Sequence, residues 1–387
     1  MMTETNPAQD IPGNTAHEII IGDAALASLC ARWQQCDFLA MDTEFIRTTT
    51  FFPHVGLIQV NDGGDTSYLV DPLTISDWSA FRAMMLNPSV TKIFHSCSED
   101  MQVFMKALDL IPAPVFDTQI AAAFLNQGFG ISYQNLVSLM QGINLPKGET
   151  RSDWLQRPLS ETQLQYAALD VACLPAIYLE QTRLLAKQHR LEWVQEECDN
   201  LLNQYRTEMT GDFSDFYLNI KGAWQLNRQQ LAILKRLAEW RELRARKRDK
   251  PRNWIIRDRS LIDIARYCPG DMEALSRIDE LGKNFLRHEG REILAQVAAA
   301  AAMPETEWPE LLPRPLDGRA KSRLKKGQQF IEKQAEALGL PVEVLARKRW
   351  LISVLQDDPG NAEDILPAEL KGWRKPYLLP GLLEAMA

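Results

Sequence analysis

Short apolar runs alternate with amphipathic stretches through residues 18–185. The apolar runs are rich in Ile, Val, Leu and aromatic residues, which favours β-strands, and the amphipathic stretches favour helices. The predicted strands are residues 17–22, 37–45, 55–61, 66–71 and 91–96. "NDGGD" at residues 61–65 predicts a hairpin turn, because glycine adopts the positive φ that tight turns need. The pattern as a whole predicts a mixed sheet with helices on its faces.

The strand-like runs end near residue 205, and the remaining pattern is helical with an internal repeat. At an offset of 90 residues the matching pairs are Pro251 and Pro341, Arg257 and Arg347, Arg259 and Arg349, Leu261 and Leu351, Ile262 and Ile352, Gly270 and Gly360, and Gly282 and Gly372. This period is too long for a solenoid and predicts two copies of a small helical domain. We therefore expect a disordered segment at 1–16, an α/β domain at 17–205, and helical domains at 206–302 and 303–387.

Composition places the chain among soluble globular proteins of two or three domains, with 387 residues, 45% apolar and 24% charged. We expect a cytoplasmic protein without a membrane segment, since no apolar run approaches the roughly 18 residues of a membrane span. The six scattered cysteines lack metal-ligand spacing and are expected to be reduced thiols. Residues 1–200 hold 11 basic and 24 acidic residues, whereas residues 201–387 hold 32 and 27. This asymmetry suits a protein in which one part holds metal and another contacts a polyanion.

Two acids stand one residue apart in the apolar stretch "FLAMDTEFIR". Residues i and i+2 of a strand share a face, so Asp42 and Glu44 are expected to point at one spot. Two like charges at that distance need a cation, a shared proton or full solvation. A solvated strand end is therefore the alternative to a metal site.

A third acid lies in "TKIFHSCSEDMQVF", where a predicted strand ends at Ser96. Ser96 and Glu99 have the spacing of a capping box, which would place Asp100 in the first turn of the next helix. An acid there either contributes to a site or only stabilises the helix dipole. Neighbouring His95 is expected to pack at the strand end, and Asp117 is expected to cap a helix or support the site.

A fourth acid follows in "SETQLQYAALDV". Ser160 and Gln163 predict a second capping box and a helix from about Glu161. Tyr166 and Asp170 then lie one turn apart on the same helix face. The alternative is a core tyrosine beside a solvated aspartate.

Taken together, Asp42, Glu44, Asp100 and Asp170 offer only hard oxygen ligands, which select Mg²⁺ or Mn²⁺ over Zn²⁺. Two such ions about 4 Å apart can activate a water and hold the leaving oxygen of a phosphodiester. Tyr166 is placed to orient that water or to help deprotonate it.

The stretches "DTEF", "HSCSEDM" and "YAALD" resemble the three motifs of the tyrosine-bearing branch of the DEDD exonucleases. "GLIQV" and the text around the third motif resemble the bacterial ribonuclease D family over residues 19–185, and the two repeats resemble the HRDC domains of that family. The resemblance implies an RNase H-like α/β 3′–5′ exonuclease domain followed by two all-α HRDC-like domains. It also implies a monomer in which Asp42, Glu44, Asp100 and Asp170 hold two divalent ions and Tyr166 orients the water. The implied products are nucleoside 5′-monophosphates, and the implied substrates are the single-stranded 3′ ends of tRNA precursors and other small structured RNAs.

Several residues are candidates for holding RNA. Phe45 either stacks on the terminal base or packs in the core, and Gln59 either bonds a ribose or bonds backbone. Lys147 either meets a phosphate or is solvated. Within the basic run at residues 241–254, the candidates are Arg246, Lys247 and Arg248. The alternative for this run is a solvated helix face.

Two other functions remain compatible with these motifs. One is a DNA exonuclease of the Werner type, which shares the catalytic core. The other is a catalytically idle RNA-binding scaffold, which loss of an acid or of the tyrosine would support. Neither loss is found in this sequence.

Overall fold

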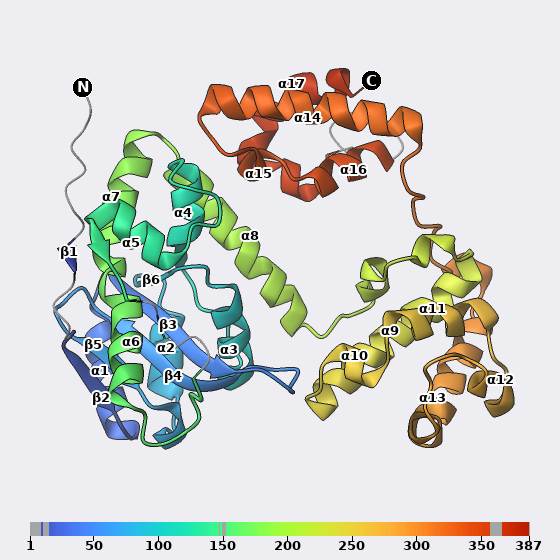
Figure 1. Cartoon of the computed structure of the whole chain (residues 1–387), viewed down its shortest axis with the longest axis horizontal. Helices are drawn as coiled ribbons and strands as arrows, with labels where there is room; N and C mark the ends of the chain where they lie inside the picture. The colour runs from blue at the N-terminus through green and yellow to red at the C-terminus, as the bar shows by residue number, and fades with distance from the viewer. Residues whose placement is uncertain (1–8, 11–14, 147, 149–151, 357–365, 387) are drawn as a thin grey trace. The chain divides into compact units, whose positions relative to one another are not determined.

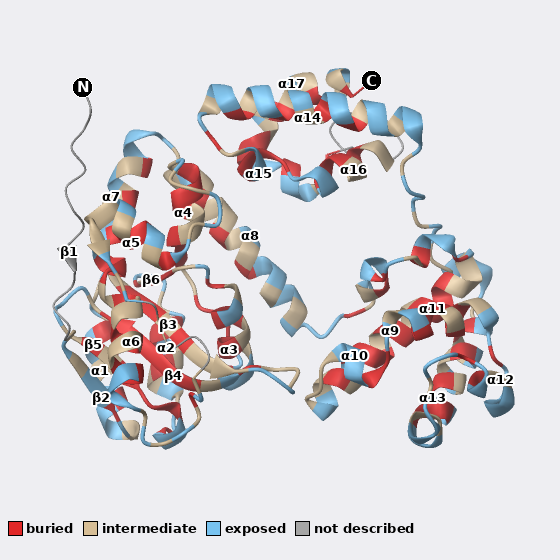
Figure 2. Cartoon of the chain, viewed as in Figure 1, coloured by how far each residue is buried: buried red, intermediate tan, exposed pale blue. Residues whose placement is uncertain are grey.

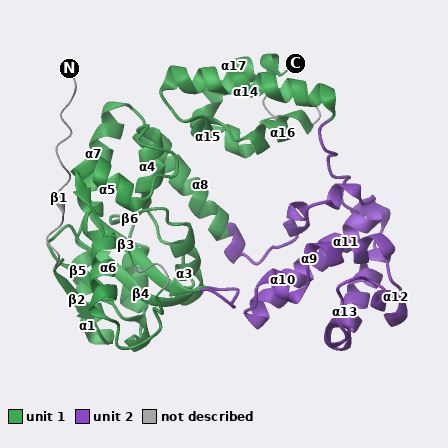
Figure 3. Ribbon diagram, in the orientation of Figure 1, with its two compact units in different colours: residues 1–46, 53–206, 317–387 green, residues 47–52, 207–316 purple. Residues whose placement is uncertain are grey.

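The structure is a computed structural model, and it describes residues 9–10, 15–146, 148, 152–356 and 366–386 (Figure 1). The chain divides into two compact units (Figure 3). The first comprises residues 1–46, 53–206 and 317–387, and the second comprises residues 47–52 and 207–316. In the described part of the chain, no helix is both long and apolar enough to cross a membrane.

A six-stranded mixed sheet organises the first unit. Its order is β2-β5-β4-β3-β6-β7, with β4 antiparallel to both β3 and β5 and the other pairs parallel. The strands are β2 (His17–Ile20), β3 (Phe38–Ile46), β4 (His54–Asn61), β5 (Ser67–Val70), β6 (Thr91–Phe94) and β7 (Val115–Asp117). The five predicted strands are all present, and the predicted turn joins β4 to β5 with Gly63 at φ 89°. The expectation of a mixed sheet flanked by helices is confirmed.

Side-chain alternation along β3 assigns a different core to each face of the sheet. Leu39 and Met41 pack with α1 (Asp23–Trp33), α2 (Ser79–Met85) and α3 (Ser98–Leu108). Ala40, on the other face, packs with α4 (Thr118–Phe124), α5 (Tyr133–Gln141) and α7 (Leu174–Lys187). On that second face, Leu57 of β4 lies under α6 (Glu161–Ala172). Figure 2 shows the buried strands between these helix layers.

The N-terminal segment predicted to be disordered lies mostly outside the described residues. Of its described part, β1 (Gln9–Asp10) pairs with β8 (Ile143–Asn144). The backbone amide of Thr15 donates to Gln165 Oε1 at 3.0 Å. These three residues of the segment therefore belong to the folded unit.

The first three helices of the two helical repeats begin at equivalent positions. In the first repeat the helices are α9 (Arg228–Arg248), α10 (Arg252–Ile255), α11 (Asp258–Tyr267), α12 (Met272–Ser276) and α13 (Lys283–Ala301). In the second they are α14 (Gly318–Leu338), α15 (Val342–Leu345), α16 (Lys348–Gln356) and α17 (Lys375–Ala385). The helices α14, α15 and α16 begin 90 residues after α9, α10 and α11, so the repeat found in the sequence is structural.

The second repeat packs in the first unit against α8 (Leu191–Met209). Trp373 stacks on Trp193 of α8 with ring centroids 4.7 Å apart. Arg374, only 3% exposed, donates to Glu197 Oε1 at 2.5 Å and to Oε2 at 2.9 Å. An aromatic stack and a bidentate ion pair therefore attach this repeat to α8.

Candidate active site

Three predicted carboxylates converge on the α6 face of the sheet. Asp42 and Glu44 are both on β3, and Asp170 is in the last turn of α6. Each offers an oxygen, and these oxygens lie within 4.8 Å of one another. The convergence follows from strand alternation at i and i+2 together with the packing of α6 over β3, β4 and β5.

Asp100 comes from α3, and its carboxylate is close enough to Asp42 for the two charges to repel. Strand β6 pairs with residues 38–40 of β3, and the β3 residues after Ala40 have no partner on β6. The chain turns at Ser96, which has φ 62°, and α3 begins at Ser98. Asp100 is 6% exposed, and its Oδ1 accepts a 2.5 Å hydrogen bond from Thr43 Oγ1. Thr43 connects Asp100 to the strand that carries Asp42 and Glu44.

The predicted capping box of Ser96 and Glu99 is wrong. The residue at the N-cap of α3 is Cys97, and its own side chain makes no capping hydrogen bond. The left-handed backbone of Ser96 is incompatible with the extended conformation that an N-cap serine needs. Asp117 replaces the box, because its carboxylate accepts from the backbone amides of Ser96 at 3.0 Å and Cys97 at 2.9 Å.

Asp117 also caps α4, as predicted, by accepting from the amides of Gln119 and Ile120. One buried carboxylate therefore holds both the turn before α3 and the start of α4. His95 packs beside this turn, with Nδ1 2.9 Å from Thr118 Oγ1 and Nε2 3.0 Å from the carbonyl of Ile131. Burial lowers the pKa of His95, so this ring is a neutral structural group, consistent with the packing expected at the strand end.

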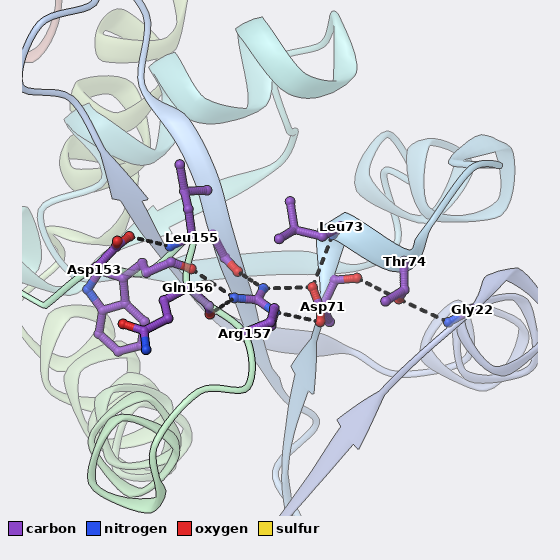
Figure 4. Close-up of polar contacts among 10 residues, drawn as sticks. Gly22, Asp71, Leu73, Thr74, Asp153, Leu155, Gln156 and Arg157 are labelled. Carbon is purple, nitrogen blue, oxygen red and sulfur yellow. Dashed lines mark hydrogen bonds and ion pairs between the residues drawn. The ribbon is translucent and has the colours of Figure 1, made fainter.

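Helix α6 begins with the predicted capping box of Ser160 and Gln163. Just before it, Arg157 binds Asp71 through two hydrogen bonds of 2.7 Å and donates to the carbonyl of Gly56 at 2.7 Å (Figure 4). Burial opposes the charge of Asp71, but the hydrogen bonds and charge of Arg157 hold its pKa below the ordinary value. This clamp ties the segment before α6 to the ends of β4 and β5.

Tyr166 and Asp170 lie one turn apart on α6, as predicted, and their side chains are hydrogen-bonded. Trp154, 2% exposed, packs with Tyr166 at a centroid distance of 6.2 Å and is a core residue. A Cβ on Gly56 would lie 2.5 Å from the carbonyl oxygen of Trp154. Glycine at position 56 thus allows the close approach that supports the tyrosine.

Burial raises the pKa of every acid in this cluster, and repulsion between carboxylates raises it further for Asp42, Glu44 and Asp100. Burial and the charge of Asp170 raise the pKa of Asp42, and burial and the charge of Asp42 raise that of Glu44 to about 10. Burial and the charge of Asp42 also raise the pKa of Asp100, and burial raises that of Asp170 to about 7. These acids are not solvated strand-end groups, so they need protons or cations. A set of oxygen ligands without His or Cys fits Mg²⁺ or Mn²⁺.

Gln59 lies opposite Asp42 in the β3–β4 pairing. It is 0% exposed, so a ribose cannot reach it, and the expected RNA contact is corrected. Neither Nε2 nor Oε1 has a hydrogen-bond partner among the described residues, so the alternative of backbone bonding is also wrong. A buried amide left without a partner costs about 1–3 kcal/mol.

The basic run of α9 is mostly engaged in ion pairs inside the second unit. Arg246 bonds Glu242 at 2.8 Å, pairs with Glu208 and lies over the ring of Phe213. Arg248 pairs with Glu289, which is 1% exposed. Arg246 therefore has partners both four residues away, in Glu242, and 38 positions away, in Glu208. RNA contact by Arg246 or by Arg248, whose side chain is 46% exposed, stays a prediction.

The remaining RNA candidates are Lys247, Phe45 and Lys147. Lys247 is exposed and Phe45 is half-buried at a register shift of the β3–β4 pairing, so contact by either stays a prediction. Lys147 lies outside the described residues. Thr43 was missed by sequence reasoning because a threonine inside an apolar strand gives no local sign of a bond to a helix 57 positions away.

Comparisons with known proteins place this arrangement in a family. Residues 17–185 match the 3′–5′ exonuclease domain family, and residues 230–297 match the HRDC domain. Ribonuclease D of Pseudomonas paraeruginosa is 40% identical over 374 residues, covering 96% of this chain and 98% of that protein. Ribonuclease D of Escherichia coli is 36% identical over 365 residues, covering 92% and 95%. The crystal structure of Escherichia coli RNase D superposes with a TM-score of 0.85, covering 96% and 98% at 34% identity.

The fold and the acidic site define a divalent-metal-dependent 3′–5′ exonuclease with an HRDC domain. More specifically, the chain belongs to the ribonuclease D family and is a 3′–5′ exoribonuclease.

Proposed function

We propose that this enzyme trims single-stranded 3′ ends of structured RNAs, tRNA precursors among them, and releases nucleoside 5′-monophosphates. The observation that carries the proposal is the convergence of the oxygens of Asp42, Glu44 and Asp170 within 4.8 Å. The structured substrate is supported by similarity, since the Escherichia coli relative is described as an exoribonuclease involved in structured RNA processing.

Asp42, Glu44, Asp100 and Asp170 would hold two divalent ions, Mg²⁺ or Mn²⁺. When bound, such ions lower the pKa of a water and stabilise charge on the leaving oxygen. The four carboxylates would supply the negative charge that offsets the ions. Thr43 fixes the orientation of Asp100 through its hydroxyl.

Tyr166 is proposed to orient the attacking water. Burial and the charge of Asp170 raise the pKa of its hydroxyl, so the phenol stays protonated at neutral pH. A protonated phenol can donate to or accept from a water but is a poor general base. Orientation is therefore favoured over proton abstraction. Arg246, Lys247, Arg248 and Phe45 remain proposed RNA contacts.

The test uses a 5′-labelled RNA with a stem and a single-stranded 3′ tail, beside a DNA of the same sequence. Wild type, Asp42→Ala and Asp37→Ala are compared in Mg²⁺, Mn²⁺ and EDTA. Asp37 is the matched control, because it is an exposed aspartate just before the same strand. A metal-dependent ladder that shortens from the 3′ end and is lost only in Asp42→Ala is expected.

The other outcomes separate the alternatives. Equal or faster cutting of the DNA would favour the Werner-type reading. RNA binding without cleavage in either metal would favour an idle scaffold. By resemblance to its family, we further propose that the protein is a cytoplasmic monomer. Sedimentation velocity of the full chain measures its mass in solution and so tests the monomeric state.

A further inference from the structure

The helical run that carries Asp170 is interrupted three residues after it, where Cys173 separates α6 from α7. In a continuous helix the backbone amide of Cys173 would donate to the carbonyl of Leu169, four residues earlier. That amide donates to the carbonyl of Val171 instead. Pro175 explains the change, because it lies in the first turn of α7 and has no N–H to offer the Val171 carbonyl. The carbonyl of Leu169 therefore needs another donor.

The hydroxyl of Tyr133 is that donor. Tyr133 is the first residue of α5 and is 8% exposed. Its hydroxyl donates to the carbonyl of Leu169 at 2.9 Å and accepts from the amide of Cys173 at 3.4 Å. A side chain inserted between two backbone groups four residues apart is a known cause of a break in a helix. Gln141, at the other end of α5, donates to the carbonyl of Cys173 at 3.1 Å. Helix α5 therefore holds the interruption at two points.

A second buried hydroxyl binds the same turn of α6 from the sheet. Ser67, the first residue of β5, is 0% exposed, and its Oγ donates to the carbonyl of Ala168 at 2.9 Å. The same Oγ accepts from Asn61 Nδ2 at 3.4 Å. The two residues that precede Asp170 therefore each have their carbonyl bound by a side chain, one from α5 and one from β5.

We propose that Tyr133 and Ser67 are positioning residues for Asp170, because their hydroxyls fix the turn of α6 that carries it. The carboxylate of Asp170 lies with those of Asp42 and Glu44, and a helix end is the part of a helix that frays most easily. Fraying would let the like charges separate and would open the cluster. Hydrogen bonds to the backbone of the turn oppose that movement. This inference rests on the proposed function, in which Asp170 holds the metal.

The test compares four full-length variants. Tyr133→Phe and Ser67→Ala each remove one hydroxyl and keep most of the side chain. Tyr178→Phe is the control for the first, because Tyr178 packs in the same core and its hydroxyl bonds no other described residue. Ser260→Ala is the control for the second, because Ser260 is 2% exposed and donates to the carbonyl of Asp279 at 3.4 Å, in the second unit.

Three quantities are measured on each variant. Titration with Mn²⁺ alone gives the metal affinity, and thermal midpoints in EDTA give the stability of the metal-free protein. Initial rates give kcat and KM for bis(4-nitrophenyl) phosphate and for the tailed RNA.

Tyr133→Phe and Ser67→Ala are each expected to weaken Mn²⁺ binding and to lower kcat on both substrates by about tenfold, since partners that orient a metal ligand typically contribute that much or more. KM for RNA should stay within about twofold of wild type, as should every value of the two controls, because neither change alters the reacting geometry. The two hydroxyls come from different elements, so one variant still tests the inference if the other does not fold.

A lower thermal midpoint with the Mn²⁺ affinity and kcat of the controls would overturn the inference, since the hydroxyls would then only stabilise the fold. An effect confined to KM for RNA would do the same. Wild type that binds Mn²⁺ but leaves RNA uncut would instead refute the proposed function, and the titrations would still decide whether the two hydroxyls position Asp170.

Discussion

Thr43 Oγ1 donates a 2.5 Å hydrogen bond to Asp100 Oδ1 across the open side of β3. The two residues come from a strand and a helix, and both are buried, at 5% and 6% exposure. Strand alternation places Thr43 on the face opposite Asp42 and Glu44. Thr43, which lies between Asp42 and Glu44 in the sequence, therefore links Asp100 to the strand that carries the other two acids.

Thr43→Val should lower kcat for RNA by about tenfold or more, because Asp100 loses the donor that orients it. Valine has nearly the volume of threonine, so packing is preserved. Initial rates on the 5′-labelled RNA give the readout, together with a thermal midpoint. Thr43→Ser keeps the hydroxyl and should retain most activity. Equal rates for the valine and serine variants would contradict the assignment.

Arg157→Met should lower the stability of the first unit by about 3 kcal/mol, since it leaves the carboxylate of Asp71 buried without its partner. For a domain of this size, that corresponds to a fall of roughly 6–12 °C in the thermal midpoint. Calorimetry of the full chain measures it. Arg183→Met is the matched control, because its pair with Glu180 is exposed at 62% and 43%. If Arg183→Met lowered the thermal midpoint as much as Arg157→Met, the contact of Arg157 with Asp71 would stabilise the protein no more than an exposed ion pair does.

Binding of Mn²⁺ should tighten as pH rises from 5.5 to 7.5. Burial raises the pKa of Asp170 to about 7, and burial with the charge of Asp42 raises that of Glu44 to about 10. Both groups are protonated at low pH and must release protons to bind a cation. Titration calorimetry in two buffers of different ionisation enthalpy counts those protons. An affinity that is constant over this range would contradict the prediction.

The same shifts give the metal-free protein the opposite dependence. The folded state of Asp170 binds its proton up to about pH 7, whereas the ordinary value is 3.8. The folded state therefore holds more protons than the unfolded state within this window, and stability falls as pH rises through it. Thermal midpoints measured in EDTA should decrease from pH 5 to pH 7.5. The Asp170→Asn variant lacks this titrating group, so the difference between its slope and that of wild type isolates the contribution of Asp170. A slope unchanged in that variant would show that Asp170 is not the cause.

Gln59→Met should raise the stability of the metal-free protein by about 1 kcal/mol, since it replaces an amide without a partner by an apolar chain of similar size. Gln181→Met provides the contrast. Gln181 is equally buried, but its Nε2 donates to the carbonyl of Thr118 at 3.0 Å. That variant should be less stable than wild type. Thermal midpoints of both variants in EDTA decide the matter, and a loss of stability in Gln59→Met would show that the amide has a partner in solution.

Local patterns predicted well whatever depends on neighbours in sequence. The strands, the turn after Asn61, the box at Ser160 and the face shared by Tyr166 and Asp170 all follow from spacings of two to four residues. The 90-residue repeat was predictable because both copies are present in one chain.

Contacts between distant segments were not predictable in this way. The turn at Ser96 takes its hydrogen bonds from Asp117, so a local capping pattern gave the wrong answer. The contacts of Arg246 with Glu208 and with the ring of Phe213 join residues far apart in sequence, so no local pattern indicated them. Gln59 has no partner at all among the described residues, which composition cannot reveal.

Asp42 and Asp170 stand at opposite ends of the nuclease sequence, and their oxygens meet only when β3 and α6 are packed together. An unfolded chain consequently offers a cation separate carboxylates and no cluster. Any cation that binds the cluster therefore adds its binding free energy to folding, by an amount that grows with the logarithm of its concentration. The melting temperature of this enzyme thus serves as a gauge of how fully its active site is loaded, even when no RNA is present.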